Sequence, residues 1–226
     1  MVLNTDVMKN IITKDIFDSY GRKLGKVVAF LTDSTKNVSS IGVELNNGDF
    51  SYYSPSQISI QDNTVVAYYP WQVESERLND EYVSALRKNS ALHKLNDSGE
   101  IPQEVYDELR KQYEFTIKSL TERCQILSED LKEKIKMLDV QVKELKTFLT
   151  NIRIEYMVQN IDEKSYTVSC LTLQNMLTRV LLEKKDMDAV LKNIPKNSSF
   201  SEIIQDLPPV TNSSQPILLR IKEAET

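Results

Sequence analysis

A stretch of 57 residues, from 103 to 159, contains neither proline nor glycine. Pro102 directly precedes it, where the missing N–H of proline costs a helix nothing, and Glu104, Asp107 and Glu108 suit the positive end of a helix dipole. A continuous helix over 103–159 would be about 85 Å long at 1.5 Å per residue. An isolated globular core does not need a helix of this length, so the sequence predicts a rod.

Apolar residues recur along this rod with coiled-coil spacing. From residue 120 to residue 156 they step by 4-3-4-4-3-4-3-4-3-4, a heptad pattern with one stutter between Leu131 and Ile135. Before residue 120 they step by fours, which locally unwinds a left-handed coil. The early positions are Val105, Leu109, Tyr113 and Ile117, and the later ones are Leu120, Cys124, Leu127, Leu131, Ile135, Leu138, Val142, Leu145, Leu149, Ile152 and Tyr156.

A turn at 160–162 precedes a second heptad pattern, in which Lys184 is the one residue that is not apolar. Its members are Tyr166, Cys170, Leu173, Leu177, Val180, Lys184, Met187, Leu191 and Ile194. Two heptad helices joined by a short connection should fold back on each other, so 163–194 should cover the distal half of the rod. The proximal half, about 103–130, would then lack a partner. We expect subunits to meet there, at Leu109, Tyr113, Ile117, Leu120 and Leu127.

Other apolar residues lie outside both heptad patterns and widen the apolar surface beyond what a two-helix contact covers. They include Phe115, Ile126, Met137, Val140, Phe148, Ile154, Leu171, Met176 and Leu182. Dimerisation or filament packing would bury them. A shorter helix is expected over 74–95, ended by turn residues at 96–99. The pattern leaves open a bundle of three or four helices that does not polymerise.

Short β-rich segments separated by turn residues make up the first third of the chain. They span 25–31, 40–45, 49–53 and 64–67, and this spacing predicts a small barrel or sandwich. Asn46-Asn47-Gly48 is the most specific turn signal, because a tight hairpin needs residues that tolerate positive φ. Gly21 and Gly25 predict a turn of this β-domain rather than a phosphate loop, since no Gly-Lys-Ser/Thr follows them.

Few residues suit catalysis, so we expect no enzyme, cofactor or metal. The single histidine, His93, falls near the end of a helix and is expected at the surface rather than as a base. Cys124 and Cys170 lie within helical patterns without metal-ligand spacing, which predicts reduced core thiols in a cytosolic protein. The longest apolar runs are far shorter than the ~20 residues of a membrane span, so any membrane role should be peripheral.

The charge pattern gives weak support to nucleic-acid binding. The net charge of −5 combines 28 basic with 33 acidic residues, and no segment is a basic block. Acidic residues interleave with the basic ones along the rod. The candidate contacts are Arg22, Lys23 and Lys26 in the β-domain and Lys132, Lys134, Lys136, Lys143 and Lys146 on the rod.

Beyond Pro195 the composition changes to Asn, Ser, Pro and Thr, as is typical of a flexible linker. Near its end, 217–222 is a β-capable hexamer with Ile217, Leu219 and Ile221 on one face. A hydrophobic strand at the tip of a tether suggests addition to the sheet of a partner. The alternative is that this strand pairs with the chain's own β-domain.

Two resemblances follow from these segments. Residues 20–28, 41–45 and 53–58 resemble a PRC-barrel, a small β-domain used mainly in protein interaction. The order of β-domain, coiled-coil hairpin, linker and terminal strand resembles the CdvA family of the archaeal Cdv (ESCRT-like) division system. The expected fold class is therefore multidomain α and β. The expected boundaries are a PRC-barrel-like domain at 1–72, a helical coiled-coil hairpin at 73–195, a disordered linker at 196–214 and a partner-binding strand at 215–226.

The family resemblance implies a cytoplasmic cytoskeletal scaffold at the division site. Such a scaffold polymerises, associates with DNA and the inner face of the membrane, and recruits the ESCRT-III-like protein CdvB. The resemblance places CdvB binding at Ile217, Leu219, Arg220 and Ile221. Direct lipid contact has little support, since only 2–3 and 7–12 are mildly amphipathic. The alternative function is a coiled-coil adaptor on DNA or chromatin that does not polymerise.

Overall fold

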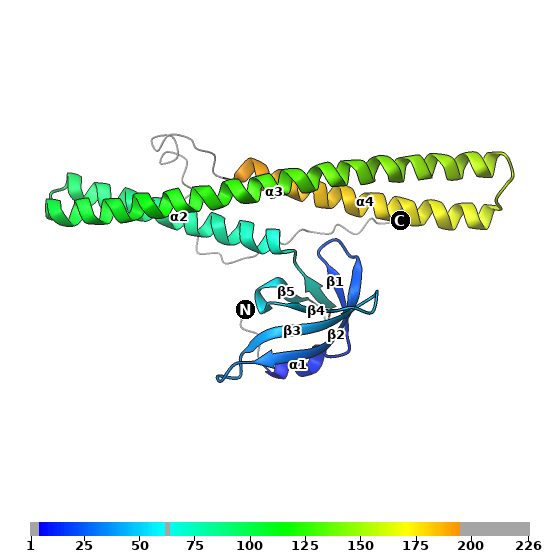
Figure 1. Ribbon diagram of the computed structural model, residues 1–226, viewed down its shortest axis with the longest axis horizontal. Coiled ribbons are helices and arrows are strands. Elements are labelled where there is room, and N and C mark those ends of the chain that lie inside the picture. The colour runs from blue at the N-terminus through cyan, green and yellow to red at the C-terminus, as the bar shows by residue number, and fades with distance from the viewer. Residues whose placement is uncertain (1–4, 62–63, 195–226) are drawn as a thin grey trace. The chain divides into compact units, whose positions relative to one another are not determined.

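The computed structural model describes residues 5–61 and 64–194, which form a small β-domain followed by three long helices (Figure 1). The predicted order of a β-domain and a helical region is confirmed. The expected linker and the residues expected to bind CdvB, which are Ile217, Leu219, Arg220 and Ile221, lie outside the described residues.

Six strands form one sheet in the order β4-β3-β2-β1-β6-β5. All neighbours are antiparallel except β1 and β6, which are parallel. The described strands do not pair β4 with β5, so the sheet is open and at most barrel-like. The bounds are β1 (Asp15–Asp18), β2 (Lys23–Thr32), β3 (Val38–Leu45), β4 (Phe50–Tyr53), β5 (Ile58–Gln61) and β6 (Thr64–Ala67), with a short 3-10 turn, η1 (Pro55–Gln57), before β5.

The core of this domain includes a short helix that the sequence did not predict, α1 (Thr5–Ile11). Met8 and Ile11 of α1 are fully buried with Ile16, Val27 and apolar residues of the other strands. The mildly amphipathic stretch at 7–12 therefore covers the domain's own core with these two side chains. Burial of its apolar face stabilises the sheet, because apolar area is removed from water.

Close approach of two strands explains the glycine in β2. A Cβ built on Gly25 would lie 1.9 Å from the carbonyl oxygen of Glu44 on β3, so only glycine fits there. The predicted hairpin at Asn46-Asn47-Gly48 is confirmed: it joins β3 to β4, and Gly48 adopts a φ of +86°. Positive φ is the backbone conformation that glycine reaches without steric cost.

The three long helices are α2 (Pro70–Asp97), α3 (Gln103–Met157) and α4 (Glu163–Asn193). α2 begins four residues before the predicted residue 74. Proline suits the first position of a helix, and the Tyr69 N–H donates to the Gln72 side chain at 2.8 Å. α3 and α4 match the predictions within two residues. Asp162 caps α4 by accepting a hydrogen bond from the Ser165 N–H at 2.7 Å.

Candidate assembly interface

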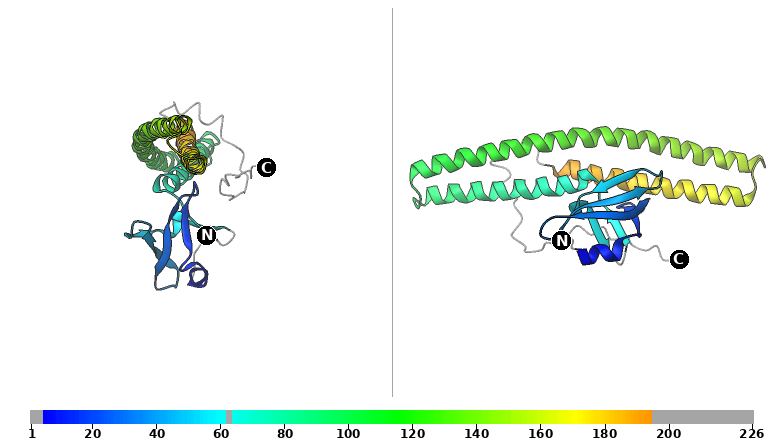
Figure 2. Two further views of the ribbon diagram at one scale, coloured as in Figure 1. Left: turned by 90° about the vertical axis from the view of Figure 1, so that its right-hand side faces the viewer. Right: turned by 60° about the horizontal axis from the view of Figure 1, so that its bottom comes forward.

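α4 folds back on the distal half of α3, as predicted (Figure 1, Figure 2). Near the connecting turn, the rings of Tyr156 and Tyr166 stack with their centroids 4.4 Å apart. Further along, Lys184 forms an ion pair with Asp139 of α3. The one charged residue in the second heptad pattern is therefore partnered, and Met187 after it is buried.

α2 packs on the proximal half of α3, so the expectation that residues 103–130 lack a partner is wrong (Figure 1). Leu78, Tyr82, Leu86 and Leu92 of α2 are buried, and Arg123 of α3 pairs with Glu74 and Glu81 of α2 at 2.8 and 3.3 Å. The apolar face of 74–95 was recognised in the sequence. The sequence did not show which helix this face packs against, because several helix faces in this chain are equally apolar.

This contact changes the place of the five residues predicted to join subunits. Ile117, Leu120 and Leu127 are buried within the chain, while Leu109 and Tyr113 are partly buried. Contact with α2 accounts for the burial of Ile117, Leu120 and Leu127. The α2–α3 layer also holds the single histidine, since His93 Nδ1 lies 2.9 Å from the Tyr106 hydroxyl.

A second set of apolar residues stays exposed on the helices. The nine residues outside the heptad patterns all belong to it, with exposed fractions from 41% for Met176 to 75% for Phe115. The set is Phe115, Ile126, Met137, Val140, Phe148, Ile154, Leu171, Met176 and Leu182. Packing of α2 and α4 on α3 therefore leaves part of the apolar surface of the helical region exposed. A large contiguous apolar surface in water is typical of protein interaction sites.

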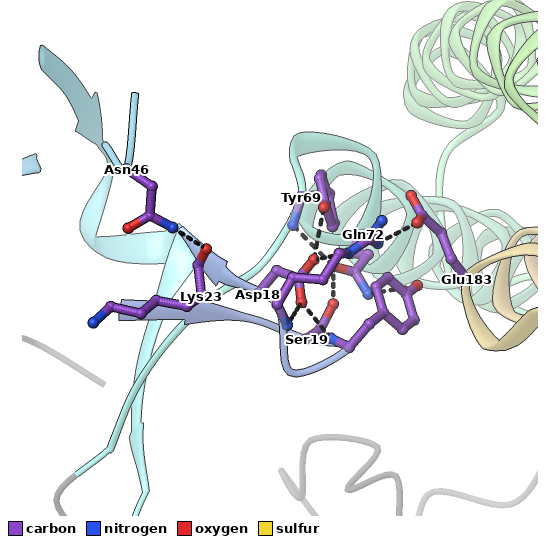
Figure 3. Close-up of polar contacts among 9 residues, drawn as sticks. Asp18, Ser19, Lys23, Asn46, Tyr69, Gln72 and Glu183 are labelled. Atoms are coloured by element: carbon purple, nitrogen blue, oxygen red, sulfur yellow. Dashed lines mark hydrogen bonds and ion pairs between the residues drawn. The ribbon is translucent and has the colours of Figure 1, made fainter. Parts of the chain in front are cut away.

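A buried carboxylate, Asp18, organises the junction between the β-domain and the helices (Figure 3). It accepts hydrogen bonds from the N–H groups of Tyr20 and Arg22 at 2.9 and 2.8 Å, from Arg22 Nε at 2.6 Å and from the Tyr69 hydroxyl at 2.8 Å. Gly21, with a φ of +76°, closes this turn, as the sequence predicted.

Arg22 also reaches the helices by an ion pair with Glu183 of α4. Burial lowers the pKa of Arg22, but the hydrogen bond to Glu183 and the charges of Asp18 and Glu183 outweigh it and raise this pKa above the ordinary value. Arg22 is thus a fixed cation between two carboxylates. The sequence placed it in a basic cluster and did not identify these partners.

The other predicted basic contacts differ in their surroundings. Lys23 pairs with Asp15 at 2.7 Å, while Lys26 is exposed. The five lysines of α3 that were predicted as contacts are all exposed. Two of the three predicted contacts in the β-domain, Arg22 and Lys23, are therefore already held by carboxylates, which reduces the charge this cluster offers to a polyanion.

The two cysteines differ in how deeply they are buried. Cys124 is buried and Cys170 half-buried, both as free thiols, and burial raises the pKa of Cys124. No cluster of three or more His, Cys, Asp or Glu side chains at 5–61 and 64–194 could hold a metal ion. Among the same residues, no helix combines the length and apolarity needed to cross a membrane.

A small β-domain tied to long paired helices with exposed apolar faces defines a coiled-coil interaction protein. Residues 70–216 match the family of the CdvA-like coiled-coil domain, and the chain belongs to this family. It is also 23% identical over 195 residues to Cell division protein A of Sulfolobus acidocaldarius. That alignment covers 86% of this chain and 81% of the relative.

Proposed function

We propose that this chain is a non-enzymatic scaffold of archaeal cell division that polymerises into filaments at the division site. Membership of the CdvA family and similarity to a cell division protein support the role in cell division. The observation that carries polymerisation is the exposure of nine apolar side chains after α2 and α4 have both packed on α3. A protein that remained monomeric would leave this surface in water.

Concentration-dependent assembly tests this function. The full chain should sediment as large particles and show filaments by electron microscopy above a threshold concentration. Arms with and without DNA distinguish the scaffold from a DNA-bound adaptor that does not polymerise. A chain that stays a monomer or a compact dimer at every concentration, with or without DNA, contradicts the scaffold.

We also propose that the C-terminal strand recruits CdvB, with Ile217, Leu219, Arg220 and Ile221 as contacts. In a strand, Ile217, Leu219 and Ile221 would share one face, and Leu218 and Arg220 would share the other. Deletion of 215–226 should abolish CdvB binding and leave assembly intact. Leu219→Asp should act like the deletion, and the matched change Leu218→Asp, on the face of Arg220, should weaken binding less. Equal loss in both variants would contradict a contact made mainly by the apolar face.

DNA and the membrane surface belong to the same proposal as peripheral contacts. The exposed lysines of α3 support DNA contact, because each phosphate contact releases counterions and makes binding depend on salt. Binding to a labelled duplex at two salt concentrations measures this directly. Binding that does not weaken as salt rises would contradict a phosphate contact.

A further inference from the structure

Four exposed apolar residues of α3 are spaced by eleven residues: Phe115, Ile126, Met137 and Phe148. Eleven residues make close to three turns of an α-helix, so these side chains lie along one line rather than winding around the helix. The line is about 50 Å long at 1.5 Å per residue. This periodicity differs from the heptad spacing of the buried face.

Acidic residues repeat with the same period beside this line. Glu122, Glu133 and Glu144 each stand four residues before an apolar member, and Glu129 and Val140 complete the row. Lys118 is the one basic residue among them. None of the three repeated glutamates forms an ion pair within the described chain. We call the row the α3 ridge, and its members are Phe115, Lys118, Glu122, Ile126, Glu129, Glu133, Met137, Val140, Glu144 and Phe148.

The outer face of α4 carries a row of opposite charge. Residues 164, 168, 171, 175, 178, 182, 185 and 189 step by 4-3-4-3-4-3-4, and all eight are exposed. Three of them are large and apolar, two are lysines, and none is acidic. We call this row the α4 ridge, and its members are Lys164, Val168, Leu171, Asn175, Thr178, Leu182, Lys185 and Ala189.

We propose that the α3 ridge of one copy binds the α4 ridge of a second copy, which deepens the proposed function by naming its assembly contact. Apolar residues on both ridges would be buried, and the glutamates of one would face the lysines of the other. A contact between two α3 ridges is disfavoured, because it sets Glu122, Glu133 and Glu144 against identical charges.

The two ridges lie on exposed sides of α3 and α4, outside the heptad faces that pack together within one chain. Each copy therefore offers one acidic and one basic ridge, and using one leaves the other free. A head-to-tail contact of this type adds copies without limit unless it closes into a ring. This property is what a filament needs.

The ion pair between Lys184 and Asp139 gives the register of α3 against α4 in one chain. Copies placed side by side at the same level would bring Lys185 of the second copy between Glu133 and Glu144. Because α3 and α4 run antiparallel, Lys164 of that copy would reach the level of residue 159, just past the end of α3 and about one helical turn beyond Glu155. In this register Lys185 thus lies between two carboxylates, and Lys164 lies within about one turn of a third.

Charge reversal on each ridge tests the contact. One variant carries Glu133→Lys with Glu144→Lys, and the other carries Lys164→Glu with Lys185→Glu. Each alone should raise the threshold concentration for assembly at least about tenfold, because like charges then face each other. An equimolar mixture should assemble near the parent's threshold, since the reversed ridge of each variant complements the other variant. Glu108→Lys with Asp130→Lys, exposed on α3 but off the ridge, is the matched control and should assemble like the parent.

The outcomes separate this contact from the proposed function. If the parent chain assembles and either ridge variant assembles equally well, the ridge contact is wrong while the scaffold stands. A mixture that fails although the parent assembles also overturns the contact. A parent chain that never assembles overturns both. Unchanged helical circular dichroism in each variant confirms that the loss lies in association and not in folding.

Discussion

Arg22 of the β-domain binds Glu183 of α4, a residue 161 positions further along the chain. The same guanidinium contacts the buried carboxylate of Asp18, and Tyr69 at the start of the helical region shares that carboxylate. One arginine therefore connects a turn of the sheet to the last described helix. This relationship makes the junction a site where single substitutions should have large effects.

Replacing Arg22 by methionine should lower the free energy of unfolding by about 2–3 kcal/mol, because Asp18 is left buried without its cation. Urea unfolding followed by the fluorescence of Trp71, the one tryptophan and a neighbour of the junction, measures the change. The matched control is Lys23→Met, which removes a more exposed pair and should cost less than about 1 kcal/mol. Equal costs would contradict a structural role for the junction.

Stability should fall as the pH rises above about 10, where the tyrosines of an unfolded chain lose their protons. Burial, and then Asp186, raises the pKa of Tyr20, and burial together with the hydrogen bond to Asp18 raises that of Tyr69. The folded state keeps these protons while the unfolded state releases them, so alkaline pH favours unfolding. The difference between the urea unfolding midpoints at pH 8 and at pH 10.5 should be smaller in the double variant Tyr20→Phe with Tyr69→Phe than in the parent chain. An unchanged difference would show that other groups control the alkaline loss.

Asn89→Leu should raise the free energy of unfolding by about 1–3 kcal/mol. Asn89 on α2 is 1% exposed, and neither polar atom of its side chain has a hydrogen-bond partner among the described residues. Burying an amide without a partner destabilises the folded state, and leucine removes that cost at similar volume. Thermal unfolding at 222 nm follows the helices. A lower midpoint for the leucine variant would indicate that Asn89 has a polar partner, such as one in an assembled state.

Ile117 and Phe115, two residues apart on α3, should respond oppositely to truncation. Ile117 is 6% exposed and Phe115 75% exposed. Ile117→Ala should lower the free energy of unfolding by about 2–4 kcal/mol through the cavity left against α2. Phe115→Ala should change it by less than about 0.5 kcal/mol and should weaken assembly. Urea unfolding below the assembly threshold, paired with sedimentation above it, separates the two effects. Similar losses of stability in both variants would contradict the burial pattern.

Long periodic segments were predicted well, and short ones only in part. The strands expected at 40–45, 49–53 and 64–67 were found as β3, β4 and β6. The helices expected over 103–159 and 163–194 were found at Gln103–Met157 and Glu163–Asn193, because apolar periodicity and capping residues act within a few turns. α1, β1 and β5 were missed, since each has seven residues or fewer and owes its stability to the rest of the domain. The junction was missed for a related reason, because Asp18 and Glu183 lie far apart in the chain and come together only in the folded protein.

Local sequence pattern accounts for the rods, their turns and the presence of more apolar surface than two helices can cover. Those features follow from residue spacing, which is the same whatever a helix packs against. Contacts between distant segments account for the rest: α2 rather than another subunit covers the proximal half of α3, and Arg22 reaches Glu183. Phe115 and Ile117 are both apolar and stand two residues apart in the sequence, yet only Ile117 is buried. Which apolar face is buried depends on which segment packs against it. That packing is determined by the fold of the whole chain.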